Sequence, residues 1–443
     1  MSQLSRRDFL RATAAAPLAA CATKPAAARP NIILIMADDL GWETLGCYGG
    51  ESYKTQELDR LASQGVRFEH AYAQPLCTPT RLQLMTGLYN YRNWKAFGIM
   101  DPEEPTFGHH MKAAGYKTCI SGKWQFYSYN PPDFEPEYRG RGKRIEDAGF
   151  DEHCVWHALH TEDKGSRYAD PVIYENGKLS TRQGEYGPDV YTAYINSFLE
   201  RHRDQPFFVY YPMALTHGPF PPTPRQEAWK TGDRHKSDAQ ANFGAMVEYM
   251  DEIIGRIARK VDELGLGERT LILFYGDNGS PRDVRSKWRG QIVQGAKGKP
   301  TDLGTRVPLI ARWTGTAPAG RVLDDLVDST DFLPTMLDAA GAKRPDLKLD
   351  GVSFLPQIKG EKGTPREWVL VHHDPRPGWD KAPYTLVRFA RDQRYKLYEE
   401  GNLFDISTDM LEERPLDPAS ESPEAKGARQ KLRAVLDRMR PAT

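Results

Sequence analysis

Short apolar runs that stop at charged or polar residues constrain the fold of this chain more than any other feature. The runs cover residues 31–37, 117–121, 206–215 and 270–275. Most are too short for a buried helix and have the length and composition of a strand buried on both faces. A long helical pattern at residues 239–264 lies among them. This alternation predicts an α/β fold in which helices sandwich a mostly parallel sheet.

The pattern changes near residue 344. Three strand-like runs follow, at 368–372, 384–389 and 395–398, and a polar helical segment covers 423–439. These features predict a smaller antiparallel α+β subdomain. We therefore expect an export segment at 1–29, a catalytic domain at 30–343 and a C-terminal subdomain at 344–443.

Residues 126–187 are rich in Pro, Gly, Tyr, His and charge, and they interrupt the strand and helix pattern. We predict that this insertion forms a rim of functional loops rather than a separate core. Several rings in it are suited either to stacking on sugars or to ordinary packing. They are Tyr127, Tyr129, Trp156, His157 and His160.

The first residues have the composition of an export signal. Arg6 and Arg7 precede Phe9-Leu10, a weakly apolar run of small residues, and then Cys21. This order resembles a twin-arginine signal. Leu18-Ala19-Ala20-Cys21 also resembles a bacterial lipobox, which would leave a lipid anchor on Cys21; cleavage near Ala28 is the alternative. From this segment we expect an exported protein, periplasmic or anchored to the cell envelope. No later run reaches the ~18 apolar residues of a membrane span, so we do not expect the mature protein to be embedded in the membrane.

Overall charge excludes one class of partner. Lys and Arg together number 60, and Asp and Glu together also number 60. No basic excess is available to neutralise a phosphate backbone, so we expect no nucleic-acid partner. The five cysteines form no CxxC pair and are too scattered for a disulfide framework.

Oxygen-bearing side chains follow two of the apolar runs. They are Asp38, Asp39, Asp277 and Asn278. Ligands bind beyond the carboxyl ends of the strands in such sheets, so these side chains are candidates for one shared site. Each pair alone would usually be a turn or a helix cap. Together with the cysteine motif described next, they predict a site for Ca²⁺ or Mg²⁺, both of which prefer hard oxygen ligands.

The strongest motif is Cys77-Thr78-Pro79-Thr80-Arg81, which continues to Leu84-Met85-Thr86-Gly87. It resembles the signature of the formylglycine-dependent sulfatases, members of the alkaline-phosphatase-like superfamily. Further blocks of that family occur in the same order, at 31–39, 122–124, 216–217, 276–279, 297–298 with 306–308, and 395–398. The resemblance implies the alkaline-phosphatase-like fold and hydrolysis of sulfate monoesters.

Residue roles follow from the same resemblance. A maturation enzyme would oxidise Cys77 to formylglycine, the nucleophile that attacks sulfur. Arg81 would hold the modified residue, Lys123 and Lys297 would bind sulfate oxygens, and His217 would protonate the leaving oxygen. The implied metal ligands are Asp38, Asp39, Asp277 and Asn278, together with the modified Cys77.

The chain departs from the family pattern at two places. Gln125 stands where relatives usually have a histidine that assists sulfate release, and glutamine cannot take a proton. Gln125 remains a candidate sulfate ligand beside Lys123, His217 and Lys297. A metal-bound carboxylate or a loop histidine could replace that base, and the candidate histidines are His109, His110, His157 and His160. Asp302-Leu303-Gly304 stands where Glu-Gly-Gly is usual.

Two other functions compete with a sulfatase. One is a phosphate or phosphonate monoester hydrolase of the same superfamily, which usually needs a second metal site; the sequence shows no second cluster of ligands. The other is a catalytically inactive glycan-binding lipoprotein, which the loss of histidine at Gln125 favours. For an active enzyme we expect the substrate to be a sulfate ester of a small molecule or oligosaccharide, and specifically of a carbohydrate.

Overall fold

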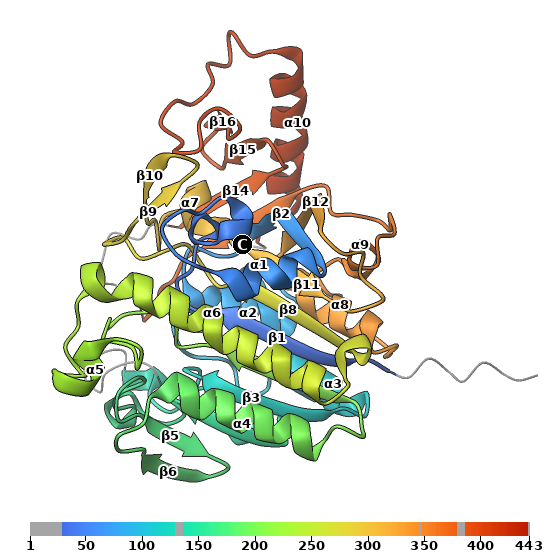
Figure 1. The fold of residues 1–443 in the computed structure, drawn as a ribbon. Coiled ribbons are helices and arrows are strands. Elements are labelled where there is room, and N and C mark those ends of the chain that lie inside the picture. Colours follow the sequence, from blue (N-terminus) through green and yellow to red (C-terminus); the bar gives the residue numbers. More distant parts are fainter. Residues whose placement is uncertain (1–28, 129–135, 345–347, 379–385, 442–443) are drawn as a thin grey trace, which may run out of the picture.

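The computed structural model describes residues 29–128, 136–344, 348–378 and 386–441 (Figure 1). The predicted export signal with Cys21, and Tyr129 of the insertion, lie outside the described residues. Within the described ranges, no helix is long and apolar enough to cross a membrane.

The strands are β1 Asn31–Ala37, β2 Val66–Tyr72, β3 Lys117–Lys123, β4 Glu152–Trp156, β5 Val172–Glu175, β6 Lys178–Thr181, β7 Phe207–Pro212, β8 Thr270–Gly276, β9 Arg285–Trp288, β10 Gln291–Gln294, β11 Leu309–Arg312, β12 Arg321–Asp328, β13 Val369–His373, β14 Val387–Arg391, β15 Tyr395–Tyr398 and β16 Leu403–Asp405. The helices are α1 Gln56–Ser63, α2 Cys77–Thr86, α3 Phe107–Ala113, α4 Gly187–Arg201, α5 Glu227–Thr231, α6 Ala239–Glu263, α7 Asp302–Thr305, α8 Phe332–Ala339, α9 Leu355–Ile358 and α10 Pro423–Arg438.

The central sheet has the strand order β12-β2-β11-β8-β1-β7-β3-β4-β5-β6. β1 lies in the middle and pairs in parallel with both β7 and β8. β11 runs antiparallel to β2 and β8, and β5 and β6 form an antiparallel edge. The predicted mostly parallel sheet is therefore confirmed, and it brings the carboxyl ends of β1, β3, β7 and β8 to one edge.

Both faces of this sheet are covered by helices, as the sequence predicts. The side chains of β1 alternate, so Ile33 and Ile35 pack into a core with α1, α4 and α6. Ile32, Leu34 and Met36 point the other way, into a core with α2, α3 and α8. Figure 1 shows α4 and α6 lying across one face, with α8 on the opposite side. The long helix begins at Ala239, where the Asp238 carboxylate caps the backbone N–H of Ala241.

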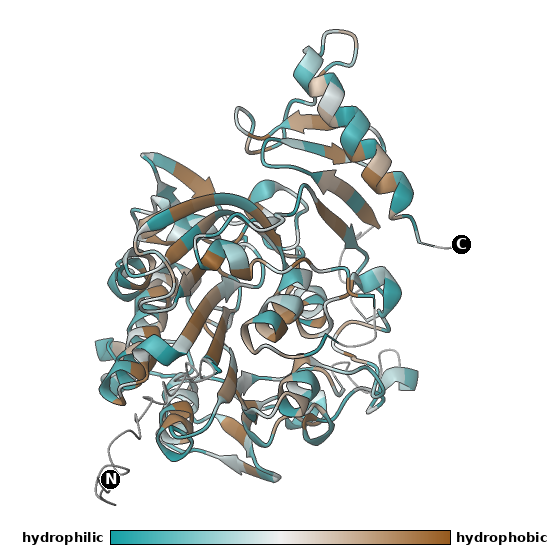
Figure 2. Ribbon diagram, turned by 90° about the vertical axis from the view of Figure 1, so that its right-hand side faces the viewer, coloured by the Kyte–Doolittle hydropathy of each residue, from teal (hydrophilic) through white to brown (hydrophobic). Residues whose placement is uncertain are grey.

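A small antiparallel sheet ordered β13-β14-β15-β16 lies toward the C-terminus, with α10 packed on it. Figure 2 shows this subdomain projecting from the main body. The observed β13 and β15 match two predicted strands, whereas β14 begins later than predicted. The sequence pattern missed β16, which has only three residues. The division at residue 343 stays a prediction.

The prediction for residues 126–187 was wrong in one respect. This segment is not only a rim of loops, because β4, β5 and β6 extend the central sheet. β4 pairs in parallel with β3 from Cys119 to Lys123. The sequence of β4, Glu-His-Cys-Val-Trp, contains two polar residues, so an apolar-run criterion overlooks it.

Candidate active site

The ends of three strands bring charged side chains together. Asp38 and Asp39 follow β1, Asp277 follows its neighbour β8, and Lys123 ends β3. The backbone N–H of Asp39 donates to Oδ1 of Asp277 at 2.9 Å. The Lys123 ammonium donates to Oδ2 of Asp38 at 2.8 Å. The parallel strands of one sheet thus place residues from distant parts of the sequence in contact.

Cys77 is the first residue of α2 and is buried beside these carboxylates. Its Sγ lies 3.6 Å from Nζ of Lys123. The Thr80 hydroxyl donates to the backbone carbonyl of Asp277 at 2.7 Å, which fixes the start of α2 against the end of β8. Free N–H groups and the helix dipole at this end favour a bound anion. Burial raises the pKa of the Cys77 thiol, and Lys123 opposes that shift.

Arg81 lies one helical turn after Cys77, on the same face of α2. Its Nε and Nη2 donate to Oδ2 of Asp277 at 3.1 and 2.9 Å, and Nη2 lies 3.6 Å from Asp38. The guanidinium is buried. Arg81 therefore ties the helix that carries Cys77 to two of the acidic residues.

Lys297 and His217 approach the site from two loops. Nζ of Lys297 donates to Oδ2 of Asp39 at 2.6 Å, and Nε2 of His217 lies 3.7 Å from the same oxygen. Nδ1 of His217 lies 2.6 Å from the Gly218 carbonyl and donates to it. Burial lowers the pKa of His217 to about 3, although Asp39 acts in the opposite direction.

The acidic residues fit a hard divalent cation. Oδ1 of Asp38 and Oδ1 of Asn278 are buried, and each lacks a hydrogen-bond partner among the described residues. Burial, and then the Asp38 carboxylate, raise the pKa of Asp277 to about 8 even though Arg81 contacts it. Buried oxygen atoms that receive no hydrogen bond are the ligands that a Ca²⁺ or Mg²⁺ ion would satisfy. The ligand atoms of Asp38, Cys77 and Asp277 all lie within 4.8 Å of one another.

Gln125 is buried just past the end of β3, two residues after Lys123. Its backbone N–H donates to the carbonyl of His157 at 3.1 Å, and both residues have a positive φ. Of the candidate replacement bases, His157 is therefore the one that contacts the backbone of Gln125. Burial lowers the pKa of His157, and Lys164, Arg167 and Lys123 add to that shift.

The other candidate bases are engaged elsewhere. The His109 ring accepts from the backbone N–H of Thr106 and caps α3, and His110 lies on the same helix. Nδ1 of His160 lies 3.0 Å from the Ser128 hydroxyl.

The Trp156 ring is buried in the core, so it serves packing rather than sugar stacking.

The sequence did not predict a group of polar contacts that fixes the Lys297 loop. We call this group the clamp; its members are Asp302, Arg391, Lys396 and Glu412. Asp302, which replaces the usual glutamate, is buried, and its carboxylate pairs with Arg391 of the C-terminal sheet. The backbone N–H of Asp302 donates to Glu412 at 2.7 Å, and Lys396 pairs with Glu412 at 2.9 Å. Only the folded subdomain brings these residues to the loop, so no local sequence signal marks them.

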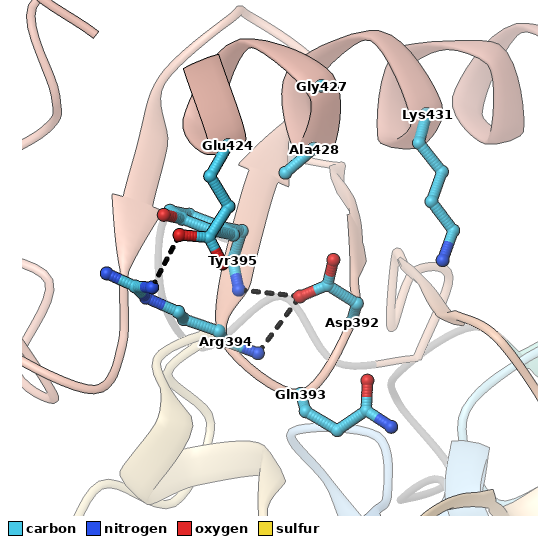
Figure 3. A pocket seen from close by; sticks show the side chains of 8 residues that line it. All are labelled: Asp392, Gln393, Arg394, Tyr395, Glu424, Gly427, Ala428 and Lys431. Carbon is cyan, nitrogen blue, oxygen red and sulfur yellow. Dashed lines mark hydrogen bonds and ion pairs between the residues drawn. The ribbon is translucent and has the colours of Figure 1, made fainter. Parts of the chain in front are cut away.

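A hollow of about 340 Å³ lies on the C-terminal subdomain (Figure 3). Arg394 pairs there with Glu424 at 2.8 Å, and Asp392 accepts from the backbone N–H groups of Arg394 and Tyr395. These charged groups satisfy one another, so the hollow offers no comparable set of reactive groups.

Comparison with known proteins gives consistent results. The profile of the family described as Sulfatase matches residues 30–342, and that described as N-sulphoglucosamine sulphohydrolase, C-terminal, matches residues 301–441. Arylsulfatase A of Bos taurus is 32% identical over 378 residues, which cover 80% of this chain and 73% of that protein. N-acetylgalactosamine-6-sulfatase of Canis lupus familiaris is 30% identical over 370 residues, covering 76% and 67%.

Solved structures share the fold. A protein in complex with its substrate D-glucosamine-2-N,6-O-disulfate superposes with a TM-score of 0.74 at 22% identity, covering 92% of this chain and 98% of that one. The phosphonate monoester hydrolase of Agrobacterium radiobacter superposes with a TM-score of 0.67 at 20% identity, covering 92% and 95%.

Proposed function

Because this chain belongs to the sulfatase family, we propose that it hydrolyses sulfate esters of carbohydrates, using a formylglycine made from Cys77 and a bound Ca²⁺ or Mg²⁺ ion. One observation carries this proposal. Cys77 begins a helix beside Lys123, and one buried oxygen each of Asp38 and Asn278 has no hydrogen-bond partner among the described residues. That arrangement provides a place for a nucleophile, a cation and an anionic group together.

Two groups would complete the chemistry of the site. Formylglycine, once hydrated, supplies a hydroxyl that attacks sulfur and a second hydroxyl that allows the aldehyde to re-form. The cation, held by Asp38, Asp39, Asp277 and Asn278, supplies positive charge beside the sulfate oxygens.

The two lysines supply further positive charge. Nζ of Lys123 lies 3.6 Å from Sγ of Cys77 and 2.8 Å from Oδ2 of Asp38. Its ammonium can therefore reach a group bound to residue 77 while it keeps its contact with Asp38. Lys297 lies in the loop that follows β10, and its Nζ contacts Asp39 at 2.6 Å. We infer that both donate to sulfate oxygens while charge is redistributed in the reaction.

Arg81 and His217 have different tasks. Arg81 fixes Asp277 and the start of α2, so it positions residue 77. The Gly218 carbonyl holds Nδ1 of His217 and leaves Nε2 facing the site. Nε2 is therefore the ring atom that donates a proton to the leaving oxygen when the ring is protonated, a form that the neighbouring Asp39 carboxylate favours.

A carbohydrate substrate is supported by the names of the similar proteins. One relative is an N-acetylgalactosamine-6-sulfatase, and one structural neighbour was solved with a disulfated glucosamine. The twin-arginine-like segment and Cys21 further support action outside the cytoplasm, with residues 1–29 as export signal or lipid anchor.

Comparison of an aryl sulfate with the matching aryl phosphate tests the proposed function. The protein should be produced with a formylglycine-generating enzyme and with Ca²⁺ or Mg²⁺. We expect a higher kcat/KM for the sulfate, and loss of turnover in Cys77→Ser, because a serine hydroxyl cannot release sulfate by re-forming an aldehyde. Preference for the phosphate would favour the phosphate or phosphonate hydrolase, and binding of sulfated sugars without turnover would favour the inactive glycan binder.

A further inference from the structure

One guanidinium beside the site has no acidic partner in the part of the chain that the structure describes. Arg167 is in the loop between β4 and β5, and its Cζ lies 4.1 Å from the centre of the Trp156 ring. Its Nη1 is buried and has no hydrogen-bond partner among the described residues. The Trp156 face fixes the plane of this cation, because a guanidinium stacks on an aromatic ring.

The loop that carries Arg167 is anchored on two sides of the site. Trp156 ends β4 and is in register with Lys123 on β3. The hydroxyl of Tyr168, the next residue, lies 2.5 Å from the His217 carbonyl and 2.6 Å from the Ala214 carbonyl. Arg167 is thereby placed between the strand end that holds Lys123 and the loop that holds His217.

Electrostatics agree with this placement. After burial, the positive charge of Arg167 is among the causes that lower the pKa of His217. It also contributes to the lowered pKa of His157, which lies next to Gln125. The charge of Arg167 therefore influences the pKa of a histidine on each side of the site.

The other cations of the site already face acids. Arg81 contacts Asp277 and Lys123 contacts Asp38, each inside the proposed cation and sulfate site. Lys297 contacts Asp39. Arg167 is the exception among these four, and a buried N–H without an acceptor is costly unless a ligand supplies one. A planar guanidinium matches the two oxygens of a carboxylate or a sulfate.

We propose that Arg167 binds a second anionic group of the substrate, a sulfate or a carboxylate on the esterified sugar or on its neighbour. This inference rests on the proposed function. It states that the enzyme recognises a second negative charge in addition to the sulfate that is cleaved. Arg167 would then determine specificity, favouring sugars with two anionic groups over sugars with one.

Competitive inhibition of 4-nitrophenyl sulfate hydrolysis tests this specificity. The inhibitors are D-glucosamine 6-O-sulfate, D-glucosamine-2-N,6-O-disulfate, and a disaccharide that joins a uronate to 6-O-sulfated glucosamine. The measured quantity is the ratio of inhibition constants for one-anion and two-anion sugars. The disulfate and the uronate distinguish the two sources of the second negative charge.

Arg167→Met should lower this ratio about 10- to 100-fold, the usual effect of losing a charge-assisted hydrogen bond. Arg167→Lys keeps the positive charge but lacks the paired N–H donors of the guanidinium, so it should lower the ratio less. Arg234→Met is a matched control, because Arg234 also stacks on a tryptophan, Trp229 at 5.2 Å, but has Asp170 as an acidic neighbour at 3.9 Å. Its ratio should equal that of the parent, and the thermal midpoints of all variants should show that they are folded.

The inference is overturned if the parent does not prefer either two-anion sugar, or if Arg167→Met and Arg167→Lys keep the parental ratio. In both cases 4-nitrophenyl sulfate turnover by the parent would still support the proposed function. A parent protein with fully converted residue 77 and bound metal that turns over no aryl sulfate would overturn both.

Discussion

The clamp on the Lys297 loop predicts a large loss of stability when one of its charges is removed. In Arg391→Met the buried Asp302 carboxylate loses its closest partner and keeps the contact with Arg306, at 3.8 Å, and the charge of nearby Lys396. Removing one partner of a buried ion pair typically costs about 3–5 kcal/mol. The Arg391 guanidinium lies over the Tyr72 ring, 4.0 Å from its centre, so a methionine there can still pack on Tyr72. This packing and the remaining contact with Arg306 place our expectation near the lower end, about 3 kcal/mol.

The assay is urea-induced unfolding of the parent, Arg391→Met, Asp302→Asn and the double variant. Because the double variant removes both charges, it should recover at least half of the loss seen in Arg391→Met. Arg376→Met is the control, since its partner Asp374 lies in a partly exposed pair whose loss should cost about 0–1 kcal/mol. A loss below about 1 kcal/mol in Arg391→Met, or a double variant no more stable than that single variant, would refute the clamp.

Three further predictions concern the metal, Gln125 and a buried histidine. Prolonged dialysis against a chelator should abolish activity and lower the thermal midpoint, because the acidic residues would then repel one another; full activity after exhaustive metal removal would contradict the metal's role. With an activated aryl sulfate, the parent should release a burst of phenol before a slower steady state, and Gln125→His should shrink that burst. Lack of a burst together with an unimproved variant would show that another residue already does this task. Burial lowers the pKa of His373 from 6.5 to about 3, so the folded state binds fewer protons than the unfolded state and stability should fall as the pH drops from 6.5 toward 3. His373→Phe should weaken this dependence in urea unfolding at pH 7 and pH 5, and an equal pH dependence in both proteins would argue against it.

The strand ends show how far the sequence alone can lead. Asp38 and Asp277 could be assigned to one edge because each follows a buried strand, and parallel strands share that edge. Their contact in the structure follows from β1 and β8 being direct neighbours. Cys77 and Arg81 are close because four residues make one helical turn.

Contacts that depend on tertiary structure could not be predicted in this way. Asp302 and Arg391 meet only because the C-terminal sheet packs against the Lys297 loop. Arg167 lies in an insertion whose composition suggests loops, and its position depends on β4, whose polar residues hide the strand. Propensity and periodicity describe single elements, whereas these contacts depend on which elements become neighbours.

Mass spectrometry of the peptide that contains residue 77, combined with activity measured on the same preparation, tests the central claim most directly. We predict that protein from the native host carries an aldehyde in place of the Cys77 thiol, and that activity on an aryl sulfate rises in proportion to the converted fraction. A fully active preparation in which residue 77 is entirely unmodified cysteine would contradict the proposed mechanism.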